Sequence, residues 1–112
     1  MAVGKLKVQV LNARNLANKE MMSKSDPYCM VELGKQSQKT KHIDSNLNPD
    51  WNGEFNFTVE EGEHILSLSV WDKNTIKRDN FMGYTYVSFD DCKKGQQTPK
   101  VSISFLAIWS TR

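Results

Sequence analysis

The stretch Lys24-Ser25-Asp26-Pro27-Tyr28-Cys29-Met30-Val31-Glu32-Leu33 joins a polar loop to an alternating apolar run. Proline fixes its own φ and pushes the preceding residue toward extended geometry. Asp26 is therefore expected at the end of a loop, held in one orientation where a strand begins. Because alternate side chains of a strand point to opposite faces, one face should carry Cys29, Val31 and Leu33.

A second acid, Asp72, follows another alternating run, in which Leu66, Leu68 and Val70 are separated by serines. A strand that ends at Asp72 and a strand that starts at Asp26 bring their carboxylates to the same rim when they run in opposite directions. Carboxylates held at one rim supply the hard oxygen ligands that Ca²⁺ prefers. The sequence therefore predicts a cation site at this rim.

Short alternating runs separated by turn residues recur along the chain. Besides the two runs above, the predicted strands are 6–10, 39–43, 55–59, 84–89 and 101–108. No stretch shows a helical period over three turns. Many short strands with turn signals roughly every 8–12 residues predict an all-β fold, an antiparallel β-sandwich.

The chain has 112 residues, of which 38% are hydrophobic and 25% are charged, the composition of an ordinary globular domain. Residues 1–112 are therefore expected to fold as a single domain. The formal net charge of +2 is too small to predict a nucleic-acid partner. Cys29 and Cys92 are expected as free thiols in a reducing compartment. No apolar run approaches the roughly 20 residues of a membrane span, and no signal-peptide core is present, so a cytoplasmic location is expected.

Five motifs fall in order along the chain at a consistent spacing. They are Asn15-Leu16, Ser25-Asp26-Pro27-Tyr28, Leu47-Asn48-Pro49-Asp50-Trp51-Asn52, Val70-Trp71-Asp72 and Asp79-Asn80-Phe81-Met82-Gly83. With these motifs, essentially the whole chain resembles a C2 domain, the calcium- and lipid-binding β-sandwich of conventional protein kinase C and synaptotagmins. The resemblance implies eight antiparallel strands in two four-stranded sheets of Greek-key type, with the tip loops at one end. It also implies peripheral docking at the inner face of anionic membranes that contain phosphatidylserine or phosphoinositide.

The resemblance also implies where calcium would bind. Its five ligand positions correspond here to Glu20, Asp26, Asp72, Asn74 and Asn80, with Asp79 beside the last of them. Relative to the family pattern, two acids are replaced by asparagine and one is lengthened to glutamate. Since calcium affinity follows the charge of the ligands, one Ca²⁺ ion of weakened affinity is expected rather than two, and Asp79 is a candidate replacement ligand. The alternative is that these acids only balance nearby lysines and Arg78.

Apolar residues in the predicted tip loops are candidates for insertion into lipid. Met21 and Met22 lie in the first loop and Ile76 lies in the third. Burying one such side chain in lipid yields about 1.5–3 kcal/mol. The alternative for the methionines is that they fold back onto the sandwich.

A lysine-rich strand face is the second predicted lipid contact. In the family such a face binds phosphoinositide headgroups, and the corresponding residues here are Tyr28, Lys35, Lys39, Lys41 and Trp71, whereas Met30 departs from the usual basic residue. Basic residues near an anionic leaflet contribute about 1 kcal/mol each. The alternative is a charged face that is only solvated.

Other classes of function find little support in the sequence. His42 and His64 have no serine, cysteine or acid at the spacing of a catalytic motif, and no phosphate-binding or zinc motif is present, so no enzyme is predicted. Nucleic-acid binding would need a broader basic stripe interleaved with aromatics. The main competing hypothesis is a module that binds a protein partner independently of calcium.

Overall fold

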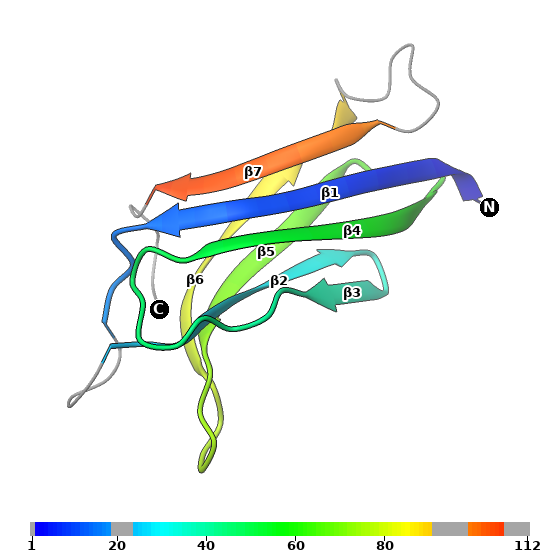
Figure 1. Ribbon diagram of the computed structural model, residues 1–112. Helices are drawn as coiled ribbons and strands as arrows, with labels where there is room; N and C mark the ends of the chain where they lie inside the picture. The colour runs from blue at the N-terminus through cyan, green and yellow to red at the C-terminus, as the bar shows by residue number, and fades with distance from the viewer. Residues whose placement is uncertain (1, 19–23, 91–98, 107–112) are drawn as a thin grey trace.

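The computed structural model describes residues 2–18, 24–90 and 99–106 as two β-sheets packed face to face (Figure 1). The described strands are β1 (Ala2–Arg14), β2 (Pro27–Leu33), β3 (Gln36–Lys39), β4 (Asp50–Glu60), β5 (Ile65–Asp72), β6 (Asn80–Ser88) and β7 (Lys100–Leu106). One sheet has the order β4-β1-β7 and the other β3-β2-β5-β6. The predicted all-β class with two sheets is confirmed. The described part of the chain contains seven strands, three in one sheet and four in the other, where eight were predicted.

The pairing of β7 with β1 is parallel, and here the fold differs from the predicted antiparallel arrangement. β6 ends at Ser88 beside Ile65 at the start of β5. The backbone N–H of Lys7 donates to the carbonyl of Pro99 (3.0 Å), so β7 begins beside the first half of β1. The chain therefore enters β7 from the end at which β1 starts, and the two strands run in the same direction.

The second predicted strand after Asp26 also differs from its expected position. The sequence predicted residues 39–43, whereas β3 covers Gln36–Lys39. Gly34 adopts a positive φ of 58° in the turn, which lets Leu33 pair directly with Gln36. The ladder then ends at Thr40, whose Oγ1 accepts a hydrogen bond from the backbone N–H of Cys29 (2.9 Å).

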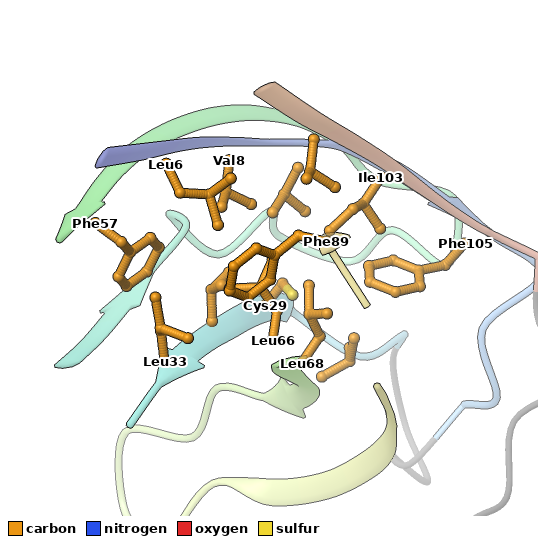
Figure 2. Close-up of a cluster of buried hydrophobic side chains, with 14 of the residues drawn as sticks. Leu6, Val8, Cys29, Leu33, Phe57, Leu66, Leu68, Phe89, Ile103 and Phe105 are labelled. Carbon is orange, nitrogen blue, oxygen red and sulfur yellow. The ribbon is translucent and has the colours of Figure 1, made fainter. Parts of the chain in front are cut away.

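The core lies between the two sheets and follows the predicted alternation. Figure 2 shows Leu6 and Val8 of β1 facing Cys29, Leu33 and other side chains of the second sheet. Cys29, Val31 and Leu33 are at most 1% exposed, as predicted. Burial raises the pKa of the Cys29 thiol, so this cysteine is a packed side chain and not a reactive thiolate. Cys92 lies outside the described residues.

Three connecting segments meet at one end of the sandwich, called the tip below. The N–H of Leu16 donates to the carbonyl of Leu47 (3.0 Å), and that of Asn46 donates to the carbonyl of Ser25 (3.1 Å). The segment that follows β5 reaches the same end, because the N–H of Lys73 donates to the carbonyl of Asp26 (3.0 Å). The prediction that the tip loops share one end is confirmed.

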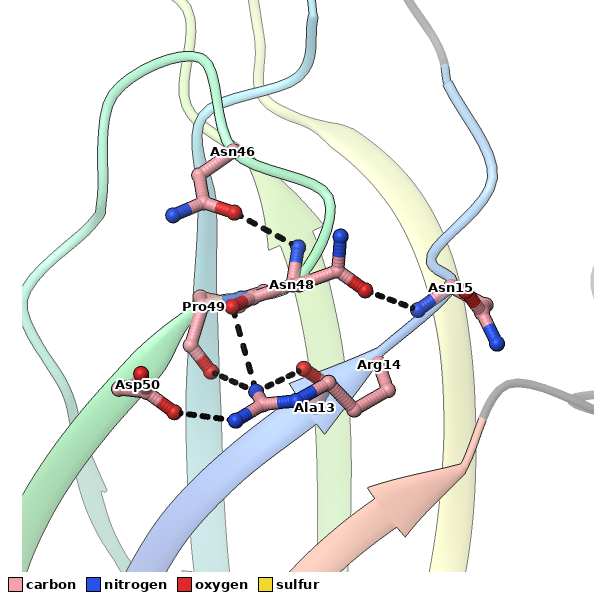
Figure 3. A network of polar contacts seen from close by, with 7 residues as sticks. All are labelled: Ala13, Arg14, Asn15, Asn46, Asn48, Pro49 and Asp50. Atoms are coloured by element: carbon pink, nitrogen blue, oxygen red, sulfur yellow. Dashed lines mark hydrogen bonds and ion pairs between the residues drawn. The ribbon is translucent and has the colours of Figure 1, made fainter.

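A polar network fixes the segment before β4 to the end of β1 (Figure 3). The Arg14 guanidinium donates to the carbonyl of Asn48 (3.2 Å) and pairs with the Asp50 carboxylate (2.7 Å). The N–H of Asn15 donates to Oδ1 of Asn48 (2.8 Å). The motif around Pro49 therefore holds two segments of the tip together. The described part of the chain contains no apolar helix of membrane-spanning length.

Candidate cation and headgroup site

Asp26 and Asp72 lie next to each other at the tip. Pro27 pairs with Asp72 in the β2–β5 register, and Oδ1 of Asp72 accepts a hydrogen bond from the backbone N–H of Asp26 (2.8 Å). The Asp26 carboxylate in turn accepts from the N–H of Ser45 (2.7 Å), which ties it to the segment before β4. Both acids are therefore held by backbone groups, and their side chains are oriented before any ligand arrives.

The second oxygen of Asp72 is the unusual feature of this site. Asp72 is 0% exposed because β5 lies between β2 and β6, and its Oδ2 has no hydrogen-bond partner within the described residues. A buried polar group without a partner costs about 1–3 kcal/mol, and a charged one costs more. A cation beside this oxygen would remove that cost, so the donor set fits a hard, oxygen-binding ion such as Ca²⁺.

The remaining predicted ligands are divided between the described and the undescribed parts of the chain. Asn80 pairs with Asp72 in the β5–β6 register, so it starts β6 beside the buried acid. Asn74 donates its side-chain amide to the carbonyl of Arg78 (2.9 Å), a contact inside the loop of residues 73–79. Glu20 lies outside the described residues. Among those that are described, no three acidic, histidine or cysteine side chains gather around one point.

Both carboxylate oxygens of Asp79, at the end of the loop of residues 73–79, have partners within the described structure. Its Oδ2 accepts a hydrogen bond from the Tyr28 hydroxyl (2.5 Å) and lies 4.0 Å from Nζ of Lys73, while Oδ1 accepts from the N–H of Asn74 (2.9 Å). Burial acts to raise the pKa of the Asp79 carboxyl, but these hydrogen bonds and the charges of Lys73 and Lys39 outweigh it, so the pKa is lowered. Both oxygens of Asp79 therefore accept hydrogen bonds, and its role as a replacement cation ligand stays a prediction.

A shallow pocket of about 420 Å³ lies beside this contact, on the outer face of β2 and β3. Its lining consists of Tyr28, Lys39, Thr40, Lys41, His42 and Lys73. Nζ of Lys39 lies 5.4 Å from the centre of the Tyr28 ring, a cation–π distance. Lys39 and Lys41 are exposed and form no ion pair within the described residues. We call this hollow the lysine pocket.

Two residues of the lysine pocket were missed from the sequence. Lys73 follows directly after β5, opposite Asp26, and lines the pocket because alternate positions of paired strands share a face, which puts Lys73 on the same face as Tyr28. Thr40 is buried and donates its hydroxyl to the carbonyl of Lys41 (2.9 Å), which fixes the direction of the chain after β3. The sequence did offer one indication of Lys73, because this lysine comes directly after Asp72, an acid that was predicted at the tip.

Lys35 and Trp71, both predicted to contact the headgroup, do not line the lysine pocket, although Trp71 pairs with Tyr28 in the β2–β5 register. Lys35 sits in the turn between β2 and β3, four residues before Lys39 and therefore about 13 Å along the strand. Trp71 donates its indole N–H to Ser69 (2.9 Å) and packs edge-on against Phe81, with ring centres 5.4 Å apart. The lining of the lysine pocket lies in the tip half of the sheet, and contact of Lys35 or Trp71 with a headgroup stays a prediction.

Trp71 instead closes a second hollow of about 490 Å³ on the outer face of β5 and β6. Phe81, Tyr84 and Tyr86 form its aromatic wall, with neighbouring ring centres 6.1 and 5.6 Å apart. Tyr84 is 41% and Tyr86 63% exposed. This aromatic face was not predicted, although the alternation in 84–89 puts Tyr84 and Tyr86 on one side of a strand.

Of the three residues predicted to insert into lipid, the structure describes only Ile76. Ile76 is 98% exposed in the loop of residues 73–79, so it has no core to enter. Met21 and Met22 lie outside the described residues. The loop of Ile76 projects from the tip below the sandwich in Figure 1.

Comparison with known proteins agrees with this geometry. The family model for the C2 domain matches residues 4–103. The protein C2-DOMAIN ABA-RELATED 11 of Arabidopsis thaliana is 43% identical over 77% of this chain, and the match spans 51% of that relative, about half its length. The chain belongs to the C2 domain family.

Solved structures support the same assignment. The C2A domain of a plant extended synaptotagmin 1 superposes with a TM-score of 0.76 at 31% identity, over 81% of this chain and 72% of that one. The calcium-bound C2A and C2B domains of extended synaptotagmin 2 superpose with a TM-score of 0.72 at 26% identity, over 84% of this chain and 37% of that one. The second of these solved neighbours therefore holds calcium on a C2 fold.

Proposed function

We propose that this chain is a membrane-targeting module that binds anionic phospholipid with the help of one Ca²⁺ ion. The observation that carries the proposal is the buried Oδ2 of Asp72, which has no hydrogen-bond partner among the described residues and lies beside Asp26 at the tip. The calcium-bound C2 neighbour supports the choice of ion. The proposal places the module on the cytoplasmic face of the membrane as a peripheral component.

In this proposal Asp26 and Asp72 hold the ion, with Asn74, Asn80 and Glu20 as further oxygen donors. When bound, Ca²⁺ supplies positive charge that attracts acidic headgroups to the tip. The chain's own contribution is to orient two carboxylates through the backbone N–H groups of Asp26 and Ser45. The small number of charged ligands favours one ion of modest affinity.

Contact with the bilayer divides between an apolar and a basic surface. Ile76 enters the interface from the exposed loop, and Met21 and Met22 are candidates for the same role from the first loop. Lys39, Lys41 and Lys73 face a phosphate-bearing headgroup in the lysine pocket, where phosphoinositide or phosphatidylserine supplies the negative charge. Ion, anchor and basic pocket would then act on the same membrane.

Calorimetry of Ca²⁺ binding, followed by sedimentation with vesicles, tests the proposal. We expect heat of binding for the wild-type chain and none for Asp26→Asn, because one of two fixed carboxylates is lost. Vesicles of phosphatidylcholine with phosphatidylserine should sediment the wild type in Ca²⁺ and less in chelator. Glu61→Gln, which changes the same charge in the exposed turn at the opposite end, is the matched control. Wild-type protein that gives no heat in millimolar Ca²⁺ contradicts the proposal.

A second candidate function is a calcium-independent protein-interaction module. The specific observation in its favour is the exposed aromatic face of Trp71, Phe81, Tyr84 and Tyr86, since aromatic residues are enriched at protein interfaces. Binding of a partner that neither chelator nor anionic lipid changes, and that Tyr84→Ala with Tyr86→Ala abolishes, would favour this function over membrane targeting.

A further inference from the structure

A carboxylate lies at the edge of the pocket that we assign to an anionic headgroup. Asp79 accepts the Tyr28 hydroxyl at 2.5 Å and lies 4.0 Å from Nζ of Lys73, and both of these partners line the lysine pocket. The Asp79 side chain is only 19% exposed, so solvent screens it less than a surface acid. The charge of Asp79 therefore lies beside the pocket, in contact with two of its lining residues.

The contacts of Asp79 match those that a phosphate oxygen would seek in the same place. A hydroxyl donor, a backbone N–H and a lysine ammonium converge on its two oxygens. These are the donors that commonly bind phosphate and carboxylate anions. A headgroup that enters the pocket would meet Lys39 and Lys41, which form no ion pair in the described structure. It would also meet Lys73, whose charge is partly offset by Asp79.

We infer that Asp79 is a specificity-determining residue of the lysine pocket, a built-in counter-ion that selects anionic headgroups of low charge over polyphosphorylated ones. The inference rests on the proposed headgroup function of the pocket. Three lysines and one carboxylate leave two net positive charges. Because Coulomb repulsion from the carboxylate grows with the charge of the ligand, a trisphosphate is penalised more than a monophosphate.

Asp79 also has a structural role that a test must separate from its charge. Oδ1 holds the N–H of Asn74 and Oδ2 holds the Tyr28 hydroxyl, so the side chain connects the loop of residues 73–79 to β2. Asp79→Asn keeps the shape and one acceptor but removes the charge. Tyr28→Phe removes one hydrogen bond but keeps the charge of the carboxylate. The two variants therefore change charge and contact separately.

The experiment is calorimetric titration of the chain with inositol 1,4,5-trisphosphate and with inositol 1-phosphate, in chelator at fixed salt. We expect Asp79→Asn to bind the trisphosphate about fivefold more tightly than wild type, the effect of about one charge, and the monophosphate by a smaller factor. Glu61→Gln, with the same change in net charge, should bind both as wild type does. Tyr28→Phe should not bind either more tightly.

The outcomes separate the inference from the proposed function. The inference is overturned if Asp79→Asn binds the trisphosphate no more tightly than wild type does. It is also overturned if Asp79→Asn binds both ligands more tightly by the same factor. The same holds if Tyr28→Phe tightens binding as much as Asp79→Asn. Lys39→Ala with Lys41→Ala that still binds the trisphosphate as wild type does overturns the headgroup assignment itself. Melting temperatures of all variants show that each one is folded.

Discussion

Asp72 and Asp79 stand at the two ends of one loop, yet their carboxylates are in opposite situations. Asp72 is fully buried and one of its oxygens has no partner in the described structure. Asp79 has a hydroxyl and a backbone N–H on its oxygens and a lysine beside them. An unpartnered buried carboxylate favours a cation, whereas a satisfied one beside lysines acts as a counter-ion. Residue type alone does not distinguish the two roles, so substitutions at the two acids should have separable effects.

Asp72→Asn should give the largest effect. It removes the charge that the proposed ion needs but leaves Oδ1 to accept the N–H of Asp26. At a hundred times its Kd, a ligand stabilises the folded state by about 2.7 kcal/mol, so Ca²⁺ should raise the Tm of the wild type by on the order of 10 °C. In Asp72→Asn this rise should vanish. The measurement is thermal unfolding with Ca²⁺ and with chelator, and a persistent rise would place the ion elsewhere.

Lys39→Ala with Lys41→Ala should come second. Two basic residues at an anionic surface contribute roughly 2 kcal/mol, so binding to phosphoinositide vesicles should weaken about 30-fold. The Ca²⁺-induced rise in Tm should remain, because neither lysine contacts the acids at the tip. Lys5→Ala with Lys100→Ala, at exposed positions near the far end, is a control with the same charge change. Equal loss in both variants would mean that only net charge matters.

Ile76→Ser should have a smaller and more selective effect. The side chain is 98% exposed, so the free energy of unfolding should change by less than about 0.5 kcal/mol. Vesicle binding in Ca²⁺ should weaken about tenfold, from the lost burial of one large apolar side chain. Binding to soluble inositol trisphosphate should not change. A loss of trisphosphate binding would show that the loop shapes the lysine pocket instead of entering lipid.

The smallest effect should be the contribution of Asp79 to the pH dependence of the free energy of unfolding. Its pKa is lowered in the folded state from the ordinary 3.8, so it stabilises the fold above that pH, and the contribution is lost as the pH falls through the folded pKa. Chemical denaturation of wild type and Asp79→Asn in chelator should show a stability difference at pH 6 that shrinks below about pH 4. A difference that stays constant across this range would contradict the charged state of Asp79.

Much of the fold could be predicted because strand alternation is a local property. Cys29, Val31 and Leu33 face the core as their spacing required. The approach of Asp26 to Asp72 also followed from the direction of two strands. Whether Lys35 and Trp71 line the lysine pocket could not be predicted, because their surroundings depend on the register between strands. No local pattern records that Met30 pairs with Lys39 on one side and with Ser69 on the other.

The sequence by itself determined the class of fold, the core faces and the arrival of two acids at one rim, because period and turn residues act over a few positions. Only the tertiary structure decided that β7 runs parallel to β1 and that Asp79 turns toward Tyr28. It also decided that Oδ2 of Asp72 is buried with no partner in the part of the chain that the structure describes. Those features depend on which distant strands pair and on which donors remain once they have paired.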